Sequence, residues 1–129
     1  YIVSHNKNRI KCHSLNDTNQ IMDLSDNIDI IGIDEAQFFD ESIIDVSNNL
    51  AKEGKRIIVA GLDRDYKAIP FGPMANLLTH ADYITKLNAI CMVCGNQASF
   101  SQRLTKDKAQ ILVGESEKYE ARCRNCYKS

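Results

Sequence analysis

Two Cys-x-x-Cys pairs constrain the fold of this 129-residue chain more than any other feature of its sequence. Cys91 and Cys94 form the first pair, Cys123 and Cys126 form the second, and 28 residues separate the pairs. Two residues between thiolates allow both sulfurs to face one metal ion, so two such turns supply the four ligands of a closed, structural zinc site. The long span between the pairs predicts a zinc ribbon with an excursion between its two knuckles.

Two other roles for these cysteines compete with zinc. Disulfides are rare inside cells, and we expect a cytoplasmic protein because no segment has the pattern of a secretion signal. A redox dithiol needs only one pair, so the repeated spacing disfavours it. We therefore expect structural zinc, which contributes on the order of 10 kcal/mol to the folding of residues 91–126. The fifth cysteine, Cys12, is expected to be a half-buried free thiol.

A strand, a helix and a second strand are predicted between residues 28 and 60. The β-branched run at 28–33 and the apolar run at 56–60 are typical of buried strands. Between them, apolar residues recur at helical spacing over 40–52, with Asp40 placed to cap the helix and Gly54 placed to end it. Such a βαβ unit requires parallel strands and a right-handed crossover.

The remaining segments are expected to complete an α/β core and a smaller metal-binding lobe. The boundary is predicted near Ala89, so that residues 1–89 form the core and residues 90–129 form the lobe. In chain order, we expect a polar loop at 61–72, a helix at 74–80, a third strand at 83–87, and lobe strands at 98–103 and 110–113.

Acidic residues follow both predicted parallel strands, at the sheet edge where open α/β folds bind ligands. Asp34 and Glu35 come directly after the first strand, and Asp63 follows the second. The first pair is typical of a Walker B strand, whose acid helps to hold Mg²⁺ beside nucleotide phosphates. Glu35 would then act as a general base, worth about 10² to 10⁴ in rate. The alternative role of Asp34 and Glu35 is a turn that caps the next helix. Asp63, the acid after the second strand, favours a ligand-binding site instead.

Aromatic residues are expected around the same edge. Each is a core residue by default, but adjacent Phe38 and Phe39, directly beyond a strand, cannot easily both enter the core. Together with Gln37, Tyr66 and Phe71, they would surround a planar ligand such as a nucleobase.

Charge and hydropathy argue against several other classes of function. Sixteen basic and seventeen acidic residues give a net charge of −1, which disfavours a polyanion-binding surface over the whole chain. Residues 103–129 carry seven Lys/Arg and four Asp/Glu, net +3, so a zinc-ribbon module that binds RNA or DNA is one alternative, although only Tyr119 and Tyr127 could stack on bases there. A P-loop ATPase or helicase fragment is the other alternative. The apolar runs are too short to cross a bilayer.

Taken together, these features resemble the type II, zinc-containing thymidine kinases. The resemblance runs from about residue 4 to residue 127 and rests on Ile31-Gly32-Ile33-Asp34-Glu35-Ala36-Gln37-Phe38-Phe39, on Ala60-Gly61-Leu62-Asp63, on Pro70-Phe71-Gly72 and on the two cysteine pairs. It implies a P-loop NTPase-like (RecA-like), mainly parallel sheet core with a small C-terminal zinc-ribbon or lasso domain. It also implies transfer of the γ-phosphoryl group of ATP to the 5′-hydroxyl of thymidine, with Mg²⁺.

The resemblance also implies roles for individual residues. Glu35 matches the family's general base, and Asp34 matches its Walker B acid, which acts on Mg²⁺. A lasso between the zinc-lobe strands, here about 104–118, closes over thymidine in the family. The positions that match nucleoside-binding residues are Phe38, Leu62, Tyr66, Phe71, Ser101, Leu112 and Tyr119. Arg103 matches a basic position of the family, to which we assign no phosphate contact.

Three further expectations follow from the same resemblance. The family's P-loop precedes the segment that matches this chain, and the chain contains no Gly-x-x-x-x-Gly-Lys-Ser/Thr motif, so we expect a fragment that is inactive as a kinase alone. A homotetramer and feedback inhibition by dTTP are implied, with no nucleic-acid or membrane partner. Asn6 stands where the family often has an aspartate, in a flexible loop at 5–8.

Overall fold

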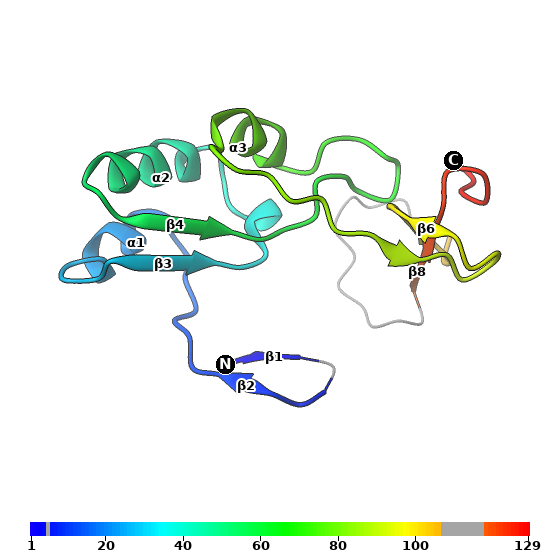
Figure 1. Ribbon diagram of the computed structural model, residues 1–129, viewed down its shortest axis with the longest axis horizontal. Helices are drawn as coiled ribbons and strands as arrows, with labels where there is room; N and C mark the ends of the chain where they lie inside the picture. The colour runs from blue at the N-terminus through cyan, green and yellow to red at the C-terminus, as the bar shows by residue number, and fades with distance from the viewer. Residues whose placement is uncertain (5, 107–117) are drawn as a thin grey trace.

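The computed structural model describes residues 1–4, 6–106 and 118–129. In chain order, its elements are β1 (Ile2–Val3), β2 (Arg9–Ile10), α1 (Asn19–Leu24), β3 (Ile30–Ile33), the 3₁₀ helix η1 (Ala36–Phe38), α2 (Ser42–Lys52), β4 (Arg56–Val59), α3 (Met74–His80), β5 (Ala89–Ile90), β6 (Gln97–Ala98), β7 (Phe100–Arg103) and β8 (Tyr119–Arg122). Figure 1 shows β3, β4 and the helices at one end of the molecule and the strands β5–β8 at the other. None of the helices in the described ranges has the length and apolarity that a membrane span requires.

The predicted βαβ unit is present. β3 pairs with β4 in parallel, in a register that places Ile30 opposite Arg56 and Ile33 opposite Val59, and α2 forms the crossover between them. These two strands alone do not establish the larger, P-loop-type sheet that the resemblance implies. What they do establish is that the chain segments following β3 and β4 leave the sheet at the same edge.

The end of α2 is formed as the sequence predicts, whereas its N-cap residue is Glu41 rather than the predicted Asp40. Asp40 lies just before the helix, and its Oδ1 accepts a hydrogen bond from the backbone N–H of Ser42 at 2.9 Å. At the other end, Gly54 has a left-handed backbone with φ 89°. The N–H of Gly54 bonds to the carbonyl of Ala51 at 3.0 Å, and the N–H of Lys55 bonds to that of Leu50 at 3.2 Å. This pair of bonds is a Schellman motif, in which glycine adopts the reversing conformation with little steric cost.

The hydrophobic core lies between the β3–β4 sheet and the helices. Ile43, Val46 and Leu50 occupy one stripe of α2 and are buried, as their helical spacing predicts. Residues from the other helices and from β3 pack against this stripe in one cluster, which contains Ile21, Ile33, Ala36, Met74 and Leu77. In Figure 1, α2 and α3 lie over the same face of the sheet.

The opposite face of the sheet differs from the prediction, which placed both strands in the interior. Ile30 is 61% exposed and Ile58 is 52% exposed, because alternate residues of a strand point to opposite faces and the described helices cover only one of them. Within residues 1–4, 6–106 and 118–129, this face is therefore open to solvent and exposes Ile30 and Ile58 beside Arg56.

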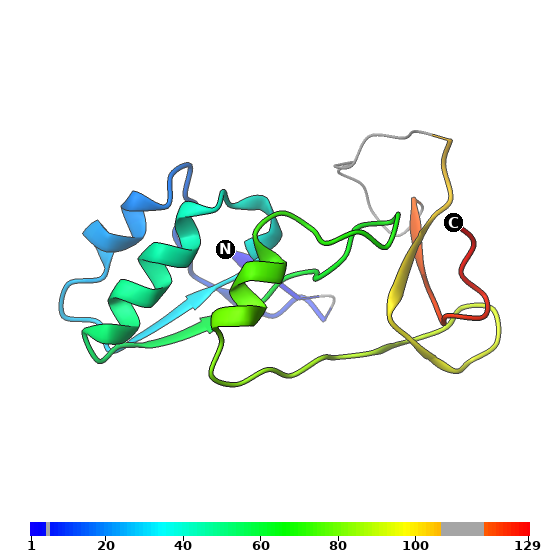
Figure 2. The same cartoon turned by 90° about the horizontal axis from the view of Figure 1, so that it is seen from above.

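The prediction of a third strand at 83–87 is wrong. Residues 81–88 form an extended connection without strand pairing, in which Tyr83 is 92% and Leu87 is 87% exposed. Figure 2 shows this segment running from α3 to the smaller lobe. Its sequence has strand propensity, but a strand also needs a neighbour to accept its backbone hydrogen bonds, and none of the described segments supplies one.

The smaller lobe consists of two antiparallel pairs of short strands. β5 pairs with β6, and β7 pairs with β8, where Ser101 lies opposite Ala121 and Arg103 lies opposite Tyr119. The strand predicted at 98–103 is thus divided between β6 and β7 at Ser99. The strand predicted at 110–113 lies outside the described residues. A hydrogen bond from the N–H of Leu104 to the carbonyl of Lys118, at 2.8 Å, closes the β7–β8 pair at the base of the 104–118 span.

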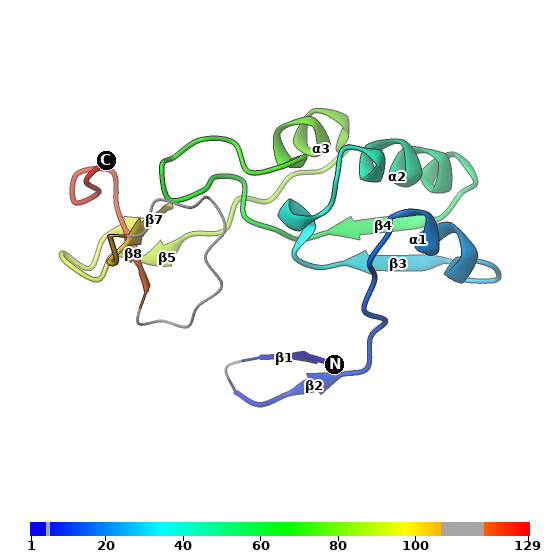
Figure 3. The same cartoon turned by 180° about the vertical axis from the view of Figure 1, so that it is seen from behind.

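The first residues form a separate antiparallel hairpin. β1 and β2 pair through Ile2 with Ile10 and Val3 with Arg9, and Lys7 has a positive φ of 63° in the turn. Figure 3 shows this hairpin lying apart from the β3–β4 sheet. Cys12 follows it and is exposed, so the prediction of a half-buried thiol is wrong, while its free state is confirmed.

Candidate functional site

The two acidic residues after β3 lie at a tightly held turn. Backbone hydrogen bonds join the strand ends, from Ala60 N–H to the Ile33 carbonyl at 2.8 Å and from Ala36 N–H to the Ala60 carbonyl at 3.0 Å. Glu35 adopts a left-handed backbone with φ 53° and ψ 42°, and its N–H bonds to Asp34 Oδ1 at 2.9 Å. Both carboxylates are exposed. The turn therefore presents two solvent-accessible carboxylates at the carboxyl end of β3.

Asp63, the acid that follows β4, is part of an ion pair. Its Oδ2 lies 2.7 Å from Nζ of Lys86, which belongs to the extended segment after α3. The carbonyl of Asp63 also accepts a hydrogen bond from the N–H of Phe71 at 3.0 Å. Asp63 thus helps to hold the loop after β4 and the connection to the smaller lobe in place. It also lies near the sheet edge at which the sequence predicts a ligand site.

Two of the predicted nucleoside-binding aromatics contact each other. The rings of Phe38 and Phe71 pack edge to face, with centroids 5.7 Å apart and an interplanar angle of 86°. Phe71 is buried, whereas Phe38 is 53% exposed. The exposed ring of Phe38 borders a shallow pocket that is lined by Leu15, Asn16, Thr18, Phe38, Phe39 and Asp40. The structure therefore brings Phe38 and Phe71 together, while the pocket beside Phe38 includes neither Tyr66 nor Leu62.

Two other predicted residues, Tyr66 and Tyr119, meet at the guanidinium of Arg103. The Cζ atom of Arg103 lies 3.6 Å from the centre of the Tyr66 ring and 5.2 Å from that of Tyr119, and Nη2 donates to the Tyr119 hydroxyl at 2.6 Å. Arg103 is only 7% exposed. Sequence patterns assigned Arg103 no such role. The signal that could have revealed this role is the cross-strand pairing of Arg103 with Tyr119, which requires the register of β7 and β8.

The 61–72 loop is attached to the smaller lobe at further points. Arg64 Nη2 donates to the carbonyl of Ser99 at 2.8 Å, and its guanidinium lies 4.1 Å from the centre of the Phe100 ring. The hydroxyl of Tyr127 donates to the carbonyl of Tyr66 at 2.5 Å. The loop that follows β4 and the base of the smaller lobe thus form a continuous set of contacts.

Asp65 stabilises the loop internally. It is buried, and its Oδ1 accepts hydrogen bonds from the N–H groups of Lys67 at 2.8 Å and Ile69 at 3.1 Å. Its own N–H bonds to the carbonyl of Ile69 at 2.9 Å. A carboxylate that holds the backbone in this way gives the loop a defined shape, which a ligand-contacting surface requires.

The remaining predicted nucleoside-binding residues occupy different environments. Leu62 is 49% exposed and directly follows Gly61 at the end of β4. Ser101 is half-buried on β7. Leu112 lies outside the described residues.

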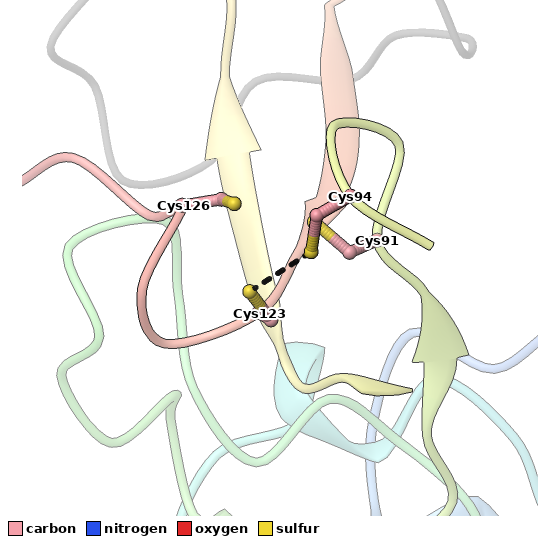
Figure 4. Close-up of side chains that lie close together, drawn as sticks. All are labelled: Cys91, Cys94, Cys123 and Cys126. Atoms are coloured by element: carbon pink, nitrogen blue, oxygen red, sulfur yellow. Dashed lines mark hydrogen bonds between the residues drawn. The ribbon is translucent and has the colours of Figure 1, made fainter. Parts of the chain in front are cut away.

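The four paired cysteines converge on one point. Their Sγ atoms all lie within 4.8 Å of one another, and those of Cys94 and Cys123 are 3.6 Å apart. Four thiolates around a tetrahedral zinc ion, with Zn–S bonds of about 2.3 Å, have sulfurs about 3.8 Å apart. Figure 4 shows the four side chains directed toward a common centre from the two knuckles. The cluster therefore fits a structural metal ion, and zinc suits its donor set.

Backbone hydrogen bonds shape both knuckles. In the first, Gly95 has φ 78°, and its N–H bonds to the carbonyl of Cys91 at 2.9 Å. In the second, the N–H of Cys126 bonds to the carbonyl of Cys123 at 3.2 Å. The N–H of Met92 reaches the carbonyl of Ala121 at 2.9 Å and so joins the first knuckle to β8. All five cysteines of the chain are free thiols, and no disulfide joins the pairs.

The pKa values of the four thiols are shifted in different directions. A hydrogen bond from the backbone N–H of Cys123 is the main cause that lowers the pKa of Cys91, to about 6. Hydrogen bonding with the Cys123 sulfur is the main cause that raises the pKa of Cys126, to about 12. Backbone donors thus stabilise the Cys91 thiolate, whereas Cys126 keeps its proton because it shares that proton with the Cys123 sulfur. A divalent cation would displace this proton and bind the sulfurs as thiolates.

Comparison with known proteins identifies relatives along nearly the whole chain. The family model described as "Thymidine kinase" matches residues 1–127. The chain is 50% identical over 126 residues to a thymidine kinase of Bacteroides fragilis and 47% identical over 126 residues to one of Rhodothermus sp.. It is 44% identical over 127 residues to one of Porphyromonas gingivalis. Each alignment includes 98% of this chain but only 59% to 63% of the relative, so the chain spans about three fifths of the length of these relatives.

Proposed function

This chain belongs to the thymidine kinase family, and we propose that the protein containing it transfers the γ-phosphoryl group of ATP to the 5′-hydroxyl of thymidine. The observation that carries the proposal is the turn at the end of β3. There, the exposed carboxylate of Glu35 lies three residues before Phe38, whose ring packs on Phe71. A proton acceptor and an aromatic surface on one sheet edge are the parts that a nucleoside kinase needs.

Glu35 is the proposed general base. Its carboxylate takes the proton of the 5′-hydroxyl as the hydroxyl oxygen forms a bond to the γ-phosphorus. The bond between that phosphorus and the β–γ bridging oxygen breaks, and ADP leaves with the electron pair. Asp34, adjacent and exposed, is the residue proposed to act on Mg²⁺. When bound, this ion neutralises charge on the phosphate oxygens.

The proposed nucleoside site lies between the core and the smaller lobe. Phe38, Phe71 and Leu62 would border it on the core side, and Tyr66, Ser101 and Tyr119 on the lobe side. Arg103 supports this arrangement because it contacts Tyr66 and Tyr119 together. Leu112, within the 104–118 span that we propose as a lasso over thymidine, belongs to the same proposed set.

A zinc ion bound by Cys91, Cys94, Cys123 and Cys126 is proposed to be structural. The sulfur geometry supports this role, and four protein ligands leave no position for a reacting water. The knuckle that contains Cys123 also follows β8, which carries Tyr119. Zinc would therefore hold one wall of the proposed nucleoside site.

The finer parts of the fold are proposals as well. We propose that β3 and β4 belong to a P-loop NTPase-like sheet within a core at residues 1–89, followed by a zinc lobe at 90–129. The parallel pairing supports a sheet larger than two strands, and the exposed apolar residues Ile30 and Ile58 support a second layer over the open face. The proposed assembly is a cytoplasmic homotetramer that dTTP inhibits; family membership alone supports these points.

Phosphorylation of thymidine tests the proposal. The protein, expressed from its complete reading frame, is incubated with radiolabelled thymidine, ATP and Mg²⁺, and thymidine 5′-monophosphate is measured. We expect product formation with thymidine, and a melting temperature raised by thymidine but not by a single-stranded oligonucleotide. Stabilisation by the oligonucleotide alone, without product, would instead indicate a nucleic-acid-binding module.

A further inference from the structure

Gln37 connects the proposed general base to the loop that follows β4. Its side chain is 3% exposed and uses both ends of its amide. Nε2 donates to Glu35 Oε2, and Oε1 accepts a hydrogen bond from the backbone N–H of Leu62 at 3.0 Å. One buried amide thus joins the proposed proton acceptor to a proposed wall of the nucleoside site.

Two glycines give the chain room to close around this side chain. A Cβ atom at Gly61 would lie 2.8 Å from Gln37 Oε1, and one at Gly72 would lie 2.3 Å from the backbone oxygen of Gln37. Gly72 also has a positive φ of 51°. The 61–72 loop can therefore approach Gln37 this closely only because both positions lack a side chain.

The backbone of Glu35 adds to the constraint. A left-handed conformation is unfavourable for a non-glycine residue and persists only where its surroundings hold it. Here the N–H of Ala36 bonds to the carbonyl of Ala60, directly after β4, and one carboxylate oxygen of Glu35 accepts a hydrogen bond from Gln37. Among the described residues, Oε1 of Glu35 has no hydrogen-bond partner in the protein. Gln37 therefore holds Oε2 of Glu35, while Oε1 is available to accept a proton.

We propose that Gln37 is a positioning residue for Glu35, an inference that rests on the proposed kinase function. By donating to Oε2, the amide fixes the rotation of the carboxylate and leaves Oε1 to receive the proton of the 5′-hydroxyl. Because the same amide holds Leu62, the proton acceptor and the nucleoside wall keep a fixed separation.

The rival role for Gln37 is simple filling of buried space. Gln37→Met keeps a similar length but removes both hydrogen bonds and leaves the N–H of Leu62 without this acceptor. We expect kcat to fall about 10- to 100-fold through misplacement of the base, with the KM for thymidine changed less than about threefold. A space-filling role would leave kcat nearly unchanged once the protein folds.

Gln37→Glu gives a second, more nearly isosteric test. It places a carboxylate beside that of Glu35, and like charges oppose ionisation of the pair. The acidic limb of the pH profile of kcat should therefore move to higher pH. Gln97→Glu, at an exposed position on β6, adds the same charge away from this turn and should leave the profile in place.

A measurement on the unchanged Gln37 covers the case in which Gln37→Met fails to fold. The side-chain amide resonances of Gln37, followed by ¹⁵N NMR in the complete protein, should respond to acid titration in the wild type and lose that response in Glu35→Gln. An unchanged kcat and pH profile in the folded Gln37 variants, or amide resonances indifferent to Glu35→Gln, would overturn the inference while thymidine phosphorylation stands. A wild type that forms no thymidine monophosphate would overturn the proposed function first, and this inference with it.

Discussion

The guanidinium of Arg103 lies 3.6 Å from the centre of the Tyr66 ring, so a cation–π contact joins the smaller lobe to the loop that follows β4. Arg103 is on β7, whose partner strand β8 leads into the second cysteine knuckle. Tyr66 is in the loop that also contains Leu62 and Phe71. We therefore expect a change in the smaller lobe to affect the residues that we propose to bind the nucleoside.

Removing the charge of Arg103 tests this connection. Arg103→Met keeps an unbranched apolar side chain but loses the cation–π contact and the bond to Tyr119. A desolvated cation–π contact is worth about 2 kcal/mol, so thymidine affinity, measured by calorimetry, should fall at least about tenfold. Lys52→Met, an exposed charge at the end of α2, is the matched control. Equal affinities in both variants would show that the contact does not support the site.

Metal binding should release protons in a predictable number. The pKa of Cys91 is lowered to about 6 and that of Cys123 is also lowered, whereas the pKa of Cys126 is raised to about 12 and that of Cys94 is also raised. Near pH 7.5, Cys126 still carries a proton that zinc must displace, whereas Cys91 is largely ionised, so binding should release at least one proton and fewer than four. Zinc titrations in buffers with different ionisation enthalpies measure this number.

A cysteine substitution checks the location of the metal. Cys123→Ser should abolish stoichiometric zinc and weaken thymidine binding before it affects ATP binding, because the lobe loses its anchor. Cys12→Ser, which changes an exposed thiol outside the cluster, should do neither. Zinc retained by Cys123→Ser, or release of four protons from the wild type, would contradict the cluster described here.

Asp40 gives a pH dependence to the stability of the α/β part. Hydrogen bonds from the side chain and then the backbone of Ser42 hold the pKa of Asp40 below its ordinary value of 3.8. The folded state thus binds this proton less readily than the unfolded state does. The stability contributed by the hydrogen bonds between Asp40 and Ser42 is therefore complete above pH 3.8 and is lost as the pH falls below that value. The melting temperature of Asp40→Asn should therefore approach that of the wild type as the pH falls below 3.8. Asp82→Asn, in the exposed connection after α3, is the matched control and should change the melting temperature little.

Local sequence signals predicted much of the fold. The β3–α2–β4 unit follows from the period of the apolar residues, and the end of α2 follows from the conformational freedom of Gly54. The strand expected at 83–87 was wrong, and so was burial of both sheet faces, because strand pairing and burial depend on neighbours that strand propensity does not specify. The short helix α1 and the β1–β2 hairpin were not predicted for the same reason: neither has a long periodic pattern.

The candidate site was predictable in its chemistry but not in its connections. The spacing of Cys91, Cys94, Cys123 and Cys126 indicated one cluster, and the sulfurs do converge. By contrast, the contact of Arg103 with Tyr66 depends on how the lobe packs on the loop. The two hydrogen bonds of the buried Gln37 amide depend on the left-handed turn at Glu35. No spacing along the chain encodes such tertiary contacts.

The central claim is that Glu35 removes the proton of a nucleoside hydroxyl, and Glu35→Gln tests it most directly. The substitution keeps the size of the side chain but removes the base. In the complete protein we expect kcat for thymidine to fall by about 10² to 10⁴, while the dissociation constant for thymidine changes less than about threefold and Glu53→Gln, an exposed control, stays fully active. An active Glu35→Gln enzyme, or a parallel loss of turnover and thymidine binding, would contradict the claim.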